Sequence, residues 1–290
     1  MPPLTALLRL MRPHQWVKNG FVFVGLIFGH AWRDPTLLVA ALLGFAAFCL
    51  LSSGVYILND WVDRESDRHH PEKRHRPLAS GAVPVPFGLG LAAVCLAGGL
   101  AVAWTASRAP WLFVAYLALQ VAYNAGAKHI VVLDVFIIAA GFMLRILAGT
   151  IGIGIPPTHW LLLCGLMLTL FLGFAKRRAE LHALADDSAV HRRVLEHYSK
   201  GLLDQFIVIA ATGTVVSYAL YTVSPETMAL HGTRWLIASV PFVLYGLLRY
   251  LYLLHRHGGG GDPAREVMTD PHLLSALAGW AILVVALLSS

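Results

Sequence analysis

The sequence predicts an all-α membrane protein with nine transmembrane helices. Of its 290 residues, 57% are hydrophobic and only 13% are charged, whereas an average soluble domain carries about 25% charged residues. Apolar runs of roughly membrane-spanning length recur nine times. The basic residues between these runs gather on alternate loops. One membrane-embedded domain, residues 1–290, is therefore expected.

The predicted spans follow one another with mostly short connections. They are 19–32, 37–58, 86–104, 111–127, 131–152, 159–175, 204–222, 235–254 and 272–288. The first run is short, and an amphipathic segment before it, Leu4–Met11, is expected to lie at the membrane interface. Only Lys128 and His129 separate the fourth run from the fifth, so this boundary is the weakest.

The basic residues also predict the orientation of the chain, because Lys and Arg concentrate in cytoplasmic loops. With the N-terminus in the cytoplasm, the outer loops hold only Arg33, Arg108 and Arg234. Arg145 and Arg249 fall within spans, and all other Lys and Arg lie on the inner side. The two long polar loops, 59–85 and 176–203, are therefore expected on the cytoplasmic face of the inner (plasma) membrane.

The most informative motif is N-D-x-x-D-x-x-x-D, directly after the second span. Its members are Asn59, Asp60, Asp63 and Asp67. On a helix the three aspartates are spaced i, i+3 and i+7, so they share one face. Carboxylates crowded in this way repel each other unless a cation lies between them, and a helix C-terminus disfavours them. Hard oxygen ligands at a membrane surface predict Mg²⁺ carrying a diphosphate. All four residues are therefore predicted metal ligands, and the aspartates are predicted to be catalytic.

Basic residues follow the acidic motif and recur in the second long loop. Lys73 and Arg76, in a segment stiffened by prolines, are suited to bind phosphate oxygens. The second loop opens with Lys176-Arg177-Arg178-Ala179-Glu180. Three successive bases at the end of a span also satisfy the helix dipole and the topology rule. A second phosphate-binding wall and a purely topological role both stay open for this run.

Two ionisable residues, Asp134 and Arg145, lie within the fifth span. Such residues are costly in a membrane and usually face the bundle interior or a polar cavity. Eleven residues of helix separate them by roughly 16 Å, so each needs another partner. Arg145 could bind a lipid phosphate or sugar phosphate, or tie its helix to a neighbour. Tyr123 and Lys128 close the preceding span on the cytoplasmic side, within reach of the same cavity.

These features resemble the UbiA superfamily of intramembrane prenyltransferases, which has nine helices and this acidic motif after the second. Within it, the segments 12–19, 70–77, 128–135, 141–149 and 176–181 look like the decaprenyl-phosphate phosphoribosyltransferase branch. The resemblance implies a UbiA-type bundle with a cytoplasm-facing active-site cavity and Mg²⁺ as cofactor. It implies transfer of 5-phosphoribose from phosphoribosyl diphosphate to a polyprenyl (decaprenyl) phosphate, for cell-wall arabinan precursors. The substrate-binding residues expected on this basis are Lys18, Lys73, Arg76, Tyr123, Lys128, Asp134, Arg145, Lys176, Arg177, Arg178, Glu180, Tyr198 and Lys200.

One departure from the wider superfamily separates the possible donors. Prenyltransferases with aromatic acceptors usually carry a second aspartate-rich motif where this chain has Lys176–Glu180, in which only Glu180 is acidic. A basic wall suits a donor with an additional phosphate and an acceptor that is itself a phosphate. A prenyltransferase with a polyprenyl diphosphate donor and a small acceptor stays open, as does a lipid-phosphate or anion transporter. The expected partners are the two substrates and the bilayer, without nucleic acid, and assembly into a homo-oligomer is left open.

Overall fold

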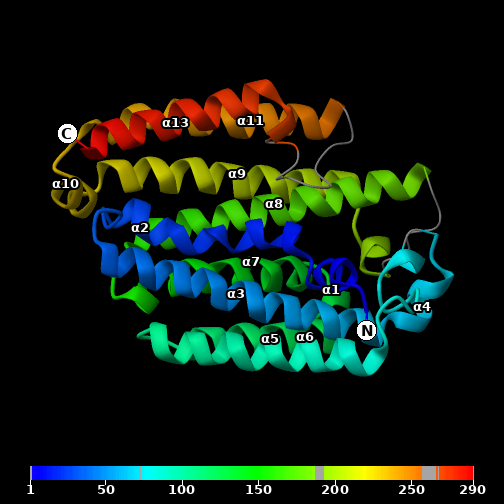
Figure 1. Ribbon diagram of the computed structural model, residues 1–290. Helices are drawn as coiled ribbons and strands as arrows, with labels where there is room; N and C mark the ends of the chain where they lie inside the picture. Colours follow the sequence, from blue (N-terminus) through cyan, green and yellow to red (C-terminus); the bar gives the residue numbers. More distant parts are fainter. Residues whose placement is uncertain (1, 72, 187–192, 257–265, 267, 290) are drawn as a thin grey trace. The chain divides into compact units, whose positions relative to one another are not determined.

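The computed structural model describes residues 2–71, 73–186, 193–256, 266 and 268–289, and every regular element among them is a helix (Figure 1). The chain divides into two compact units. Unit 1 comprises Met1–Ala122 and Leu144–Pro156, and unit 2 comprises Tyr123–Met143 and Pro157–Ser290.

Seven of the nine predicted spans coincide with helical segments that are long and apolar enough to cross a membrane. These are α3 (Pro35–Val62), α5 (Val85–Ala106), α7 (Leu133–Ala148) with η4 (Ile151–Ile153), α8 (His159–Asp186), α9 (Lys200–Val223), η6 (Trp235–Ser239) with α11 (Val240–Arg256), and α13 (Pro271–Ser289). The chain is therefore a multi-pass membrane protein.

The other two predicted spans form shorter elements. The run at 111–127 contains α6 (Trp111–Ala125), an apolar helix of 15 residues. The run at 19–32 is covered by the 3₁₀ helix η1 (Pro13–Phe23) and the five-residue α2 (Val24–Phe28). Glycine, the poorest helix former apart from proline, recurs here at positions 20, 25 and 29, which disfavours a long regular helix.

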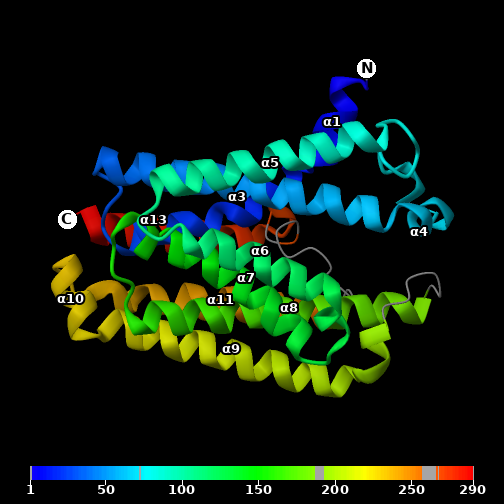
Figure 2. The same ribbon diagram turned by 90° about the horizontal axis from the view of Figure 1, so that it is seen from below.

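In unit 1, α3 and α5 pack side by side along their lengths, as both views show (Figure 1, Figure 2). Helix α1 (Leu4–Met11) and η1 pack against α3 as well. Buried aromatic rings fill the core between them: Phe48 of α3 lies 4.6 Å from Phe113 and 5.3 Å from Tyr116 of α6, centroid to centroid. This packing holds the middle of α3, the helix whose C-terminal end carries the acidic motif.

Two glycines allow backbone segments of unit 1 to touch directly. A Cβ atom on Gly149, just after α7, would lie 1.7 Å from the carbonyl oxygen of Val22 in η1. A Cβ atom on Gly25 of α2 would lie 1.7 Å from the carbonyl oxygen of Gly149. No side chain fits at either position without a shift of the backbone, so the close crossing of these segments requires both glycines.

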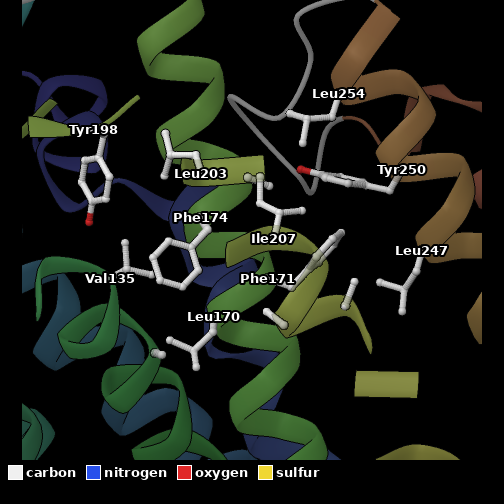
Figure 3. Packing of buried hydrophobic residues seen from close by; sticks show 14 of the residues in the cluster. Val135, Leu170, Phe171, Phe174, Tyr198, Leu203, Ile207, Leu247, Tyr250 and Leu254 are labelled. Atoms are coloured by element: carbon white, nitrogen blue, oxygen red, sulfur yellow. The ribbon is translucent and has the colours of Figure 1, made fainter. Parts of the chain in front are cut away.

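In unit 2, α8 packs along α9, and α11 packs along α13. A large apolar cluster holds α7, α8, α9 and α11 together, with Phe171 and Phe174 of α8 in its middle (Figure 3). Tyr198, between η5 (Arg193–His197) and α9, belongs to the same cluster and is buried. The cluster therefore anchors the end of the second long loop on the membrane helices.

Asp270 stabilises the start of α13 in two ways. Its Oδ1 accepts a hydrogen bond from the backbone N–H of Leu273 at 2.8 Å, and its Oδ2 accepts one from Arg249 Nη2 at 2.7 Å. The hydrogen bond from Arg249 is the main reason that the pKa of Asp270 falls to about 2. A depressed pKa contributes stability that is present above the unfolded-state pKa, about 3.9, and is lost as the pH falls through about 2.

We expect Asp270→Ala to lower the free energy of unfolding by about 1 kcal/mol, the usual cost of a lost N-cap. Unfolding of the purified protein in detergent, followed against pH, measures this effect. Asp270→Asn is the matched control because asparagine also caps helices. The asparagine variant should keep most of the free energy of unfolding at neutral pH. Between pH 4 and pH 2 its free energy of unfolding should fall less steeply than that of wild type. An alanine variant as stable as wild type would contradict the cap.

Candidate active site

The acidic motif lies where α3 ends and α4 (Arg64–His69) begins. Asp60 belongs to the last turns of α3 and is only 2% exposed, and Asp67 of α4 is only 3% exposed. Asp63 caps α3 between them and is exposed, and Asn59 is half-buried. The expected continuous helix is thus interrupted at Asp63, so the three carboxylates do not share one helix face.

The guanidinium of Arg76 joins the two buried carboxylates. Its Nη1 donates to Asp67 Oδ2 at 2.7 Å and to Asp60 Oδ1 at 3.0 Å. A predicted phosphate ligand and two predicted metal ligands therefore meet at one point. Lys73, the other predicted base of this segment, is exposed on η2 (Lys73–His75).

Arg12 is a member of this group that the sequence analysis missed. Its Nη2 donates to Asp60 Oδ1 at 2.5 Å, and its guanidinium lies 5.2 Å from the centre of the Tyr56 ring. Arg12 has a positive φ of 55°, and this αL conformation turns the chain from α1 into η1. The sequence did place Arg12 at the start of the segment 12–19, one of the segments that carry the family resemblance. The same segment contains the predicted substrate ligand Lys18. Lys18 is half-buried and donates to Gln15.

The donor set of Asp60 and Asp67 suits a hard cation, since their oxygens converge on a single cationic nitrogen, Arg76 Nη1. Within the described ranges, no three His, Cys, Asp or Glu side chains are grouped closely enough to hold a metal ion. Mg²⁺ commonly binds through one or two carboxylates together with water and substrate phosphate. Two converging carboxylates therefore match the number that a protein usually contributes to a Mg²⁺ site.

A second polar group of unit 1 surrounds Arg145 of α7, which is buried. Its Nε donates to Asn19 Oδ1 at 2.8 Å, and its guanidinium lies 5.1 Å from the Phe48 ring centre and 4.8 Å from that of Tyr116. Asn19 in turn donates to Ser52 Oγ of α3 at 3.4 Å. Arg145 thus links η1, α3, α6 and α7, as the structural alternative for this residue expects.

Unit 2 contains a third polar group, centred on Arg177 of α8. Arg177 is 1% exposed, and its Nε donates to Asp134 Oδ2 of α7, itself 0% exposed, at 2.7 Å. It also donates to Glu180 Oε2 at 2.6 Å and to the Tyr123 hydroxyl at 3.4 Å. The hydroxyl of Tyr198 donates to Asp134 Oδ1 at 2.9 Å. Five predicted site residues therefore form one hydrogen-bonded group.

The remaining predicted bases of unit 2 are Arg178, Lys176, Lys128 and Lys200. Arg178 is buried, and it donates to Asp204 of α9 and to the carbonyl oxygen of Leu254 near the end of α11, the latter at 2.9 Å. It therefore ties three helices together. Lys176 and Lys128 of η3 (Ala127–His129) are half-buried, and Lys200 is exposed at the start of α9.

These observations define the chain as a helical membrane protein in which several of the predicted site residues belong to three polar groups, two in unit 1 and one in unit 2. The model of the UbiA prenyltransferase family matches residues 20–268. The chain belongs to this family.

Similar proteins cover almost the whole chain. The decaprenyl-phosphate phosphoribosyltransferase of Corynebacterium glutamicum is 33% identical over 286 residues, which span 96% of this chain and 85% of that protein. The protein of the same name from Mycolicibacterium smegmatis is 33% identical, over 96% of this chain and 90% of its own length. Among solved structures, a UbiA homologue from Archaeoglobus fulgidus bound to GPP and Mg²⁺ superposes with a TM-score of 0.68. It covers 98% of this chain and 97% of its own, and at 17% identity it supports the fold alone.

Proposed function

We propose that this protein transfers 5-phosphoribose from 5-phosphoribosyl 1-diphosphate to a polyprenyl phosphate, such as decaprenyl phosphate, and releases diphosphate. The observation that carries the proposal is the similarity, over 96% of the chain, to relatives named for this activity. The lack of a second aspartate-rich motif at Lys176–Glu180, where only Glu180 is acidic, also favours a donor and an acceptor that are both rich in phosphate.

The acidic group of unit 1 is the proposed site for Mg²⁺. Asp60 and Asp67 would supply the principal oxygens, and Asn59 and Asp63 are further candidate ligands on the same segment. When bound, the metal neutralises the charge that develops on the departing diphosphate. Arg12 and Arg76, with side chains 23% and 28% exposed, are accessible enough to donate hydrogen bonds to phosphate oxygens as well.

The predicted lysines, none of which is fully buried, are further proposed phosphate ligands. In unit 1 they are Lys18 and Lys73, and in unit 2 they are Lys128, Lys176 and Lys200. Arg145, Arg177 and Arg178 use their guanidinium groups for hydrogen bonds to buried protein atoms. We therefore assign these arginines a positioning role, with Asp134, Tyr123 and Glu180 as the partners that orient Arg177.

The proposed reaction is a single displacement at the anomeric carbon. An oxygen of the polyprenyl phosphate attacks this carbon as the bond to the diphosphate oxygen breaks, through an oxocarbenium-like state, so that the configuration inverts. The attacking phosphate is already ionised at neutral pH, and no strong general base is needed. Catalysis then rests on positioning and electrostatic stabilisation. The excess of Lys and Arg in alternate loops supports a cytoplasmic N-terminus and active site in the plasma membrane.

The test uses purified protein with Mg²⁺, radiolabelled phosphoribosyl diphosphate and decaprenyl phosphate, followed by organic extraction. Label should move into the lipid phase, and EDTA should abolish the transfer. Asp60→Asn should lower the rate by about a hundredfold or more, because it removes a preorganised charge from the site. Glu65→Gln is the matched control, since Glu65 is exposed in the same segment and pairs only with its neighbours Arg64 and Arg68 in the described structure.

Other outcomes would contradict the proposal. If no label moves while a polyprenyl diphosphate is consumed with an aromatic acceptor, the protein is a prenyltransferase with a lipid donor. If lipid phosphate crosses the membrane of reconstituted vesicles with EDTA present, and no covalent product forms, the protein is a transporter.

A further inference from the structure

We propose that Tyr198 is a positioning residue of unit 2. It holds a strained turn at the start of α7, and this turn places Lys128 and the Asp134–Arg177 pair. This turn, the Val132 turn, comprises residues 130–134. The inference rests on the proposed transfer reaction for its effect on the rate, whereas the contact between Tyr198 and the turn is independent of it.

The strain lies in the backbone of Val132, whose φ is +68°. Three non-glycine residues of the described structure have a positive φ, namely Arg12, His30 and Val132. Val132 alone among these three is β-branched, and a β-branched side chain makes this conformation a genuine outlier. Such backbone persists only where surrounding contacts determine it, and these positions cluster at functional sites.

The turn has a backbone hydrogen bond of its own, from Asp134 N–H to the carbonyl oxygen of Ile130 at 3.0 Å, and Tyr198 adds the contact that reaches Val132 from outside the segment. Its hydroxyl oxygen accepts a hydrogen bond from the backbone N–H of Val132 at 2.7 Å and donates its proton to Asp134 Oδ1 at 2.9 Å. One hydroxyl thus fixes both the strained residue and the carboxylate two positions later. Its donor and one of its acceptor positions are occupied by protein atoms, so Tyr198 acts through the turn.

The Tyr198 ring is itself held firmly. It is 5% exposed and belongs to the apolar cluster that includes Val135, Phe174 and Leu203. Figure 3 shows the ring beside Val135, with the hydroxyl directed toward that side. Burial raises the pKa of Tyr198 to about 12, so the hydroxyl keeps its proton and can donate to Asp134 at any physiological pH.

The turn connects two parts of the proposed site. On its N-terminal side η3 carries Lys128, a proposed phosphate ligand. On its C-terminal side Asp134 binds Arg177. A turn that relaxes to an ordinary conformation would displace both, and a displacement of about 1 Å can reduce a rate by about a hundredfold. Tyr198 therefore connects the end of the second long loop to the geometry of the proposed site.

A rescue experiment tests the inference. Tyr198→Phe removes the hydroxyl, and we expect it to lower kcat by about tenfold to a hundredfold. Glycine adopts a positive φ without strain, so Val132→Gly, which also loses a side chain packed against the apolar cluster, is the reference for the double variant. The double variant Tyr198→Phe/Val132→Gly should regain most of the lost activity, because the turn then needs no contact to hold it. Val131→Gly is the matched control, since Val131 has no positive φ, and it should not rescue Tyr198→Phe.

Hydrogen exchange of the backbone amides in residues 127–135, measured without substrates, provides a readout that does not depend on activity. Exchange should be slow in wild type and faster in Tyr198→Phe. If wild type shows this protection but transfers no phosphoribose, the proposed function fails while the contact stands. The inference is overturned if Tyr198→Phe exchanges and reacts like wild type. Two outcomes with an inactive Tyr198→Phe would also overturn the inference. In one, neither Val132→Gly nor Val131→Gly restores its activity; in the other, both restore it equally. In either case the hydroxyl acts by another route than the turn.

Discussion

Asp134→Ala is expected to destabilise the protein by about 3–5 kcal/mol, the cost of removing one partner from a buried ion pair. The reason is the position of Arg177, which is 1% exposed and would keep its charge without the carboxylate that lies 2.7 Å away. Glu180 would remain as a partner for Arg177, but its side chain is 18% exposed and contacts a different nitrogen. Unfolding in detergent, followed by the loss of helical signal, measures the change.

A double variant separates stability from activity at this pair. Replacing a buried ion pair by apolar residues of similar volume is often neutral or stabilising. Asp134→Leu/Arg177→Met should therefore unfold close to wild type, and it should nevertheless transfer no phosphoribose if the pair positions the reacting groups. A double variant that is stable and fully active would show that the pair serves the fold alone. If Asp134→Ala were as stable as wild type, the contribution of the pair to the fold would be refuted.

Gly149→Ala is expected to have the second large effect, a loss of at least about 3 kcal/mol of stability, at the upper end of the range for overpacking. The new methyl group would lie 1.7 Å from the carbonyl oxygen of Val22, and a backbone atom cannot swing away as a side chain does. The measurement is again unfolding in detergent, together with the yield of folded protein.

Gly90→Ala is the matched control for this variant. Gly90 lies inside α5, and a Cβ atom there would meet nothing within 4 Å. Alanine is the better helix former by about 1 kcal/mol, so Gly90→Ala should leave the protein as stable as before or slightly more stable. Equal effects of the two substitutions would mean that the crossing of Val22 and Gly149 is not tightly packed.

Hydropathy and length predicted the long helices because spanning a membrane requires about 20 apolar residues in any context. Hydropathy and length did not predict η1 and α2. Both elements lie in close backbone contact with Gly149, just after α7. That contact joins residues more than 120 positions apart in the sequence, Val22 and Gly149. Spacing arguments for a single helix carry no information about such a crossing.

The charged residues of the three polar groups, except for Arg12, were named from the sequence, whereas their contacts were not. The argument that Asp134 and Arg145 each need a separate partner is confirmed, since Asp134 binds Arg177 and Arg145 binds Asn19. Which partner each would find depends on neighbouring helices. Arg12 was missed for the same reason: it reaches Asp60 across 48 residues of sequence.

The two arginines on the acidic motif have a consequence for how the site is assembled. Asp60 and Asp67 together carry two negative charges; Arg12 pairs with Asp60, and Arg76 pairs with both carboxylates. The four side chains are thus electrically neutral as a set. Zinc fingers and similar small domains fold only when their metal arrives, because metal binding supplies their folding free energy. In this chain, by contrast, each of the two buried carboxylates already has a cationic partner within the protein, so these four side chains need no bound cation to balance their charge.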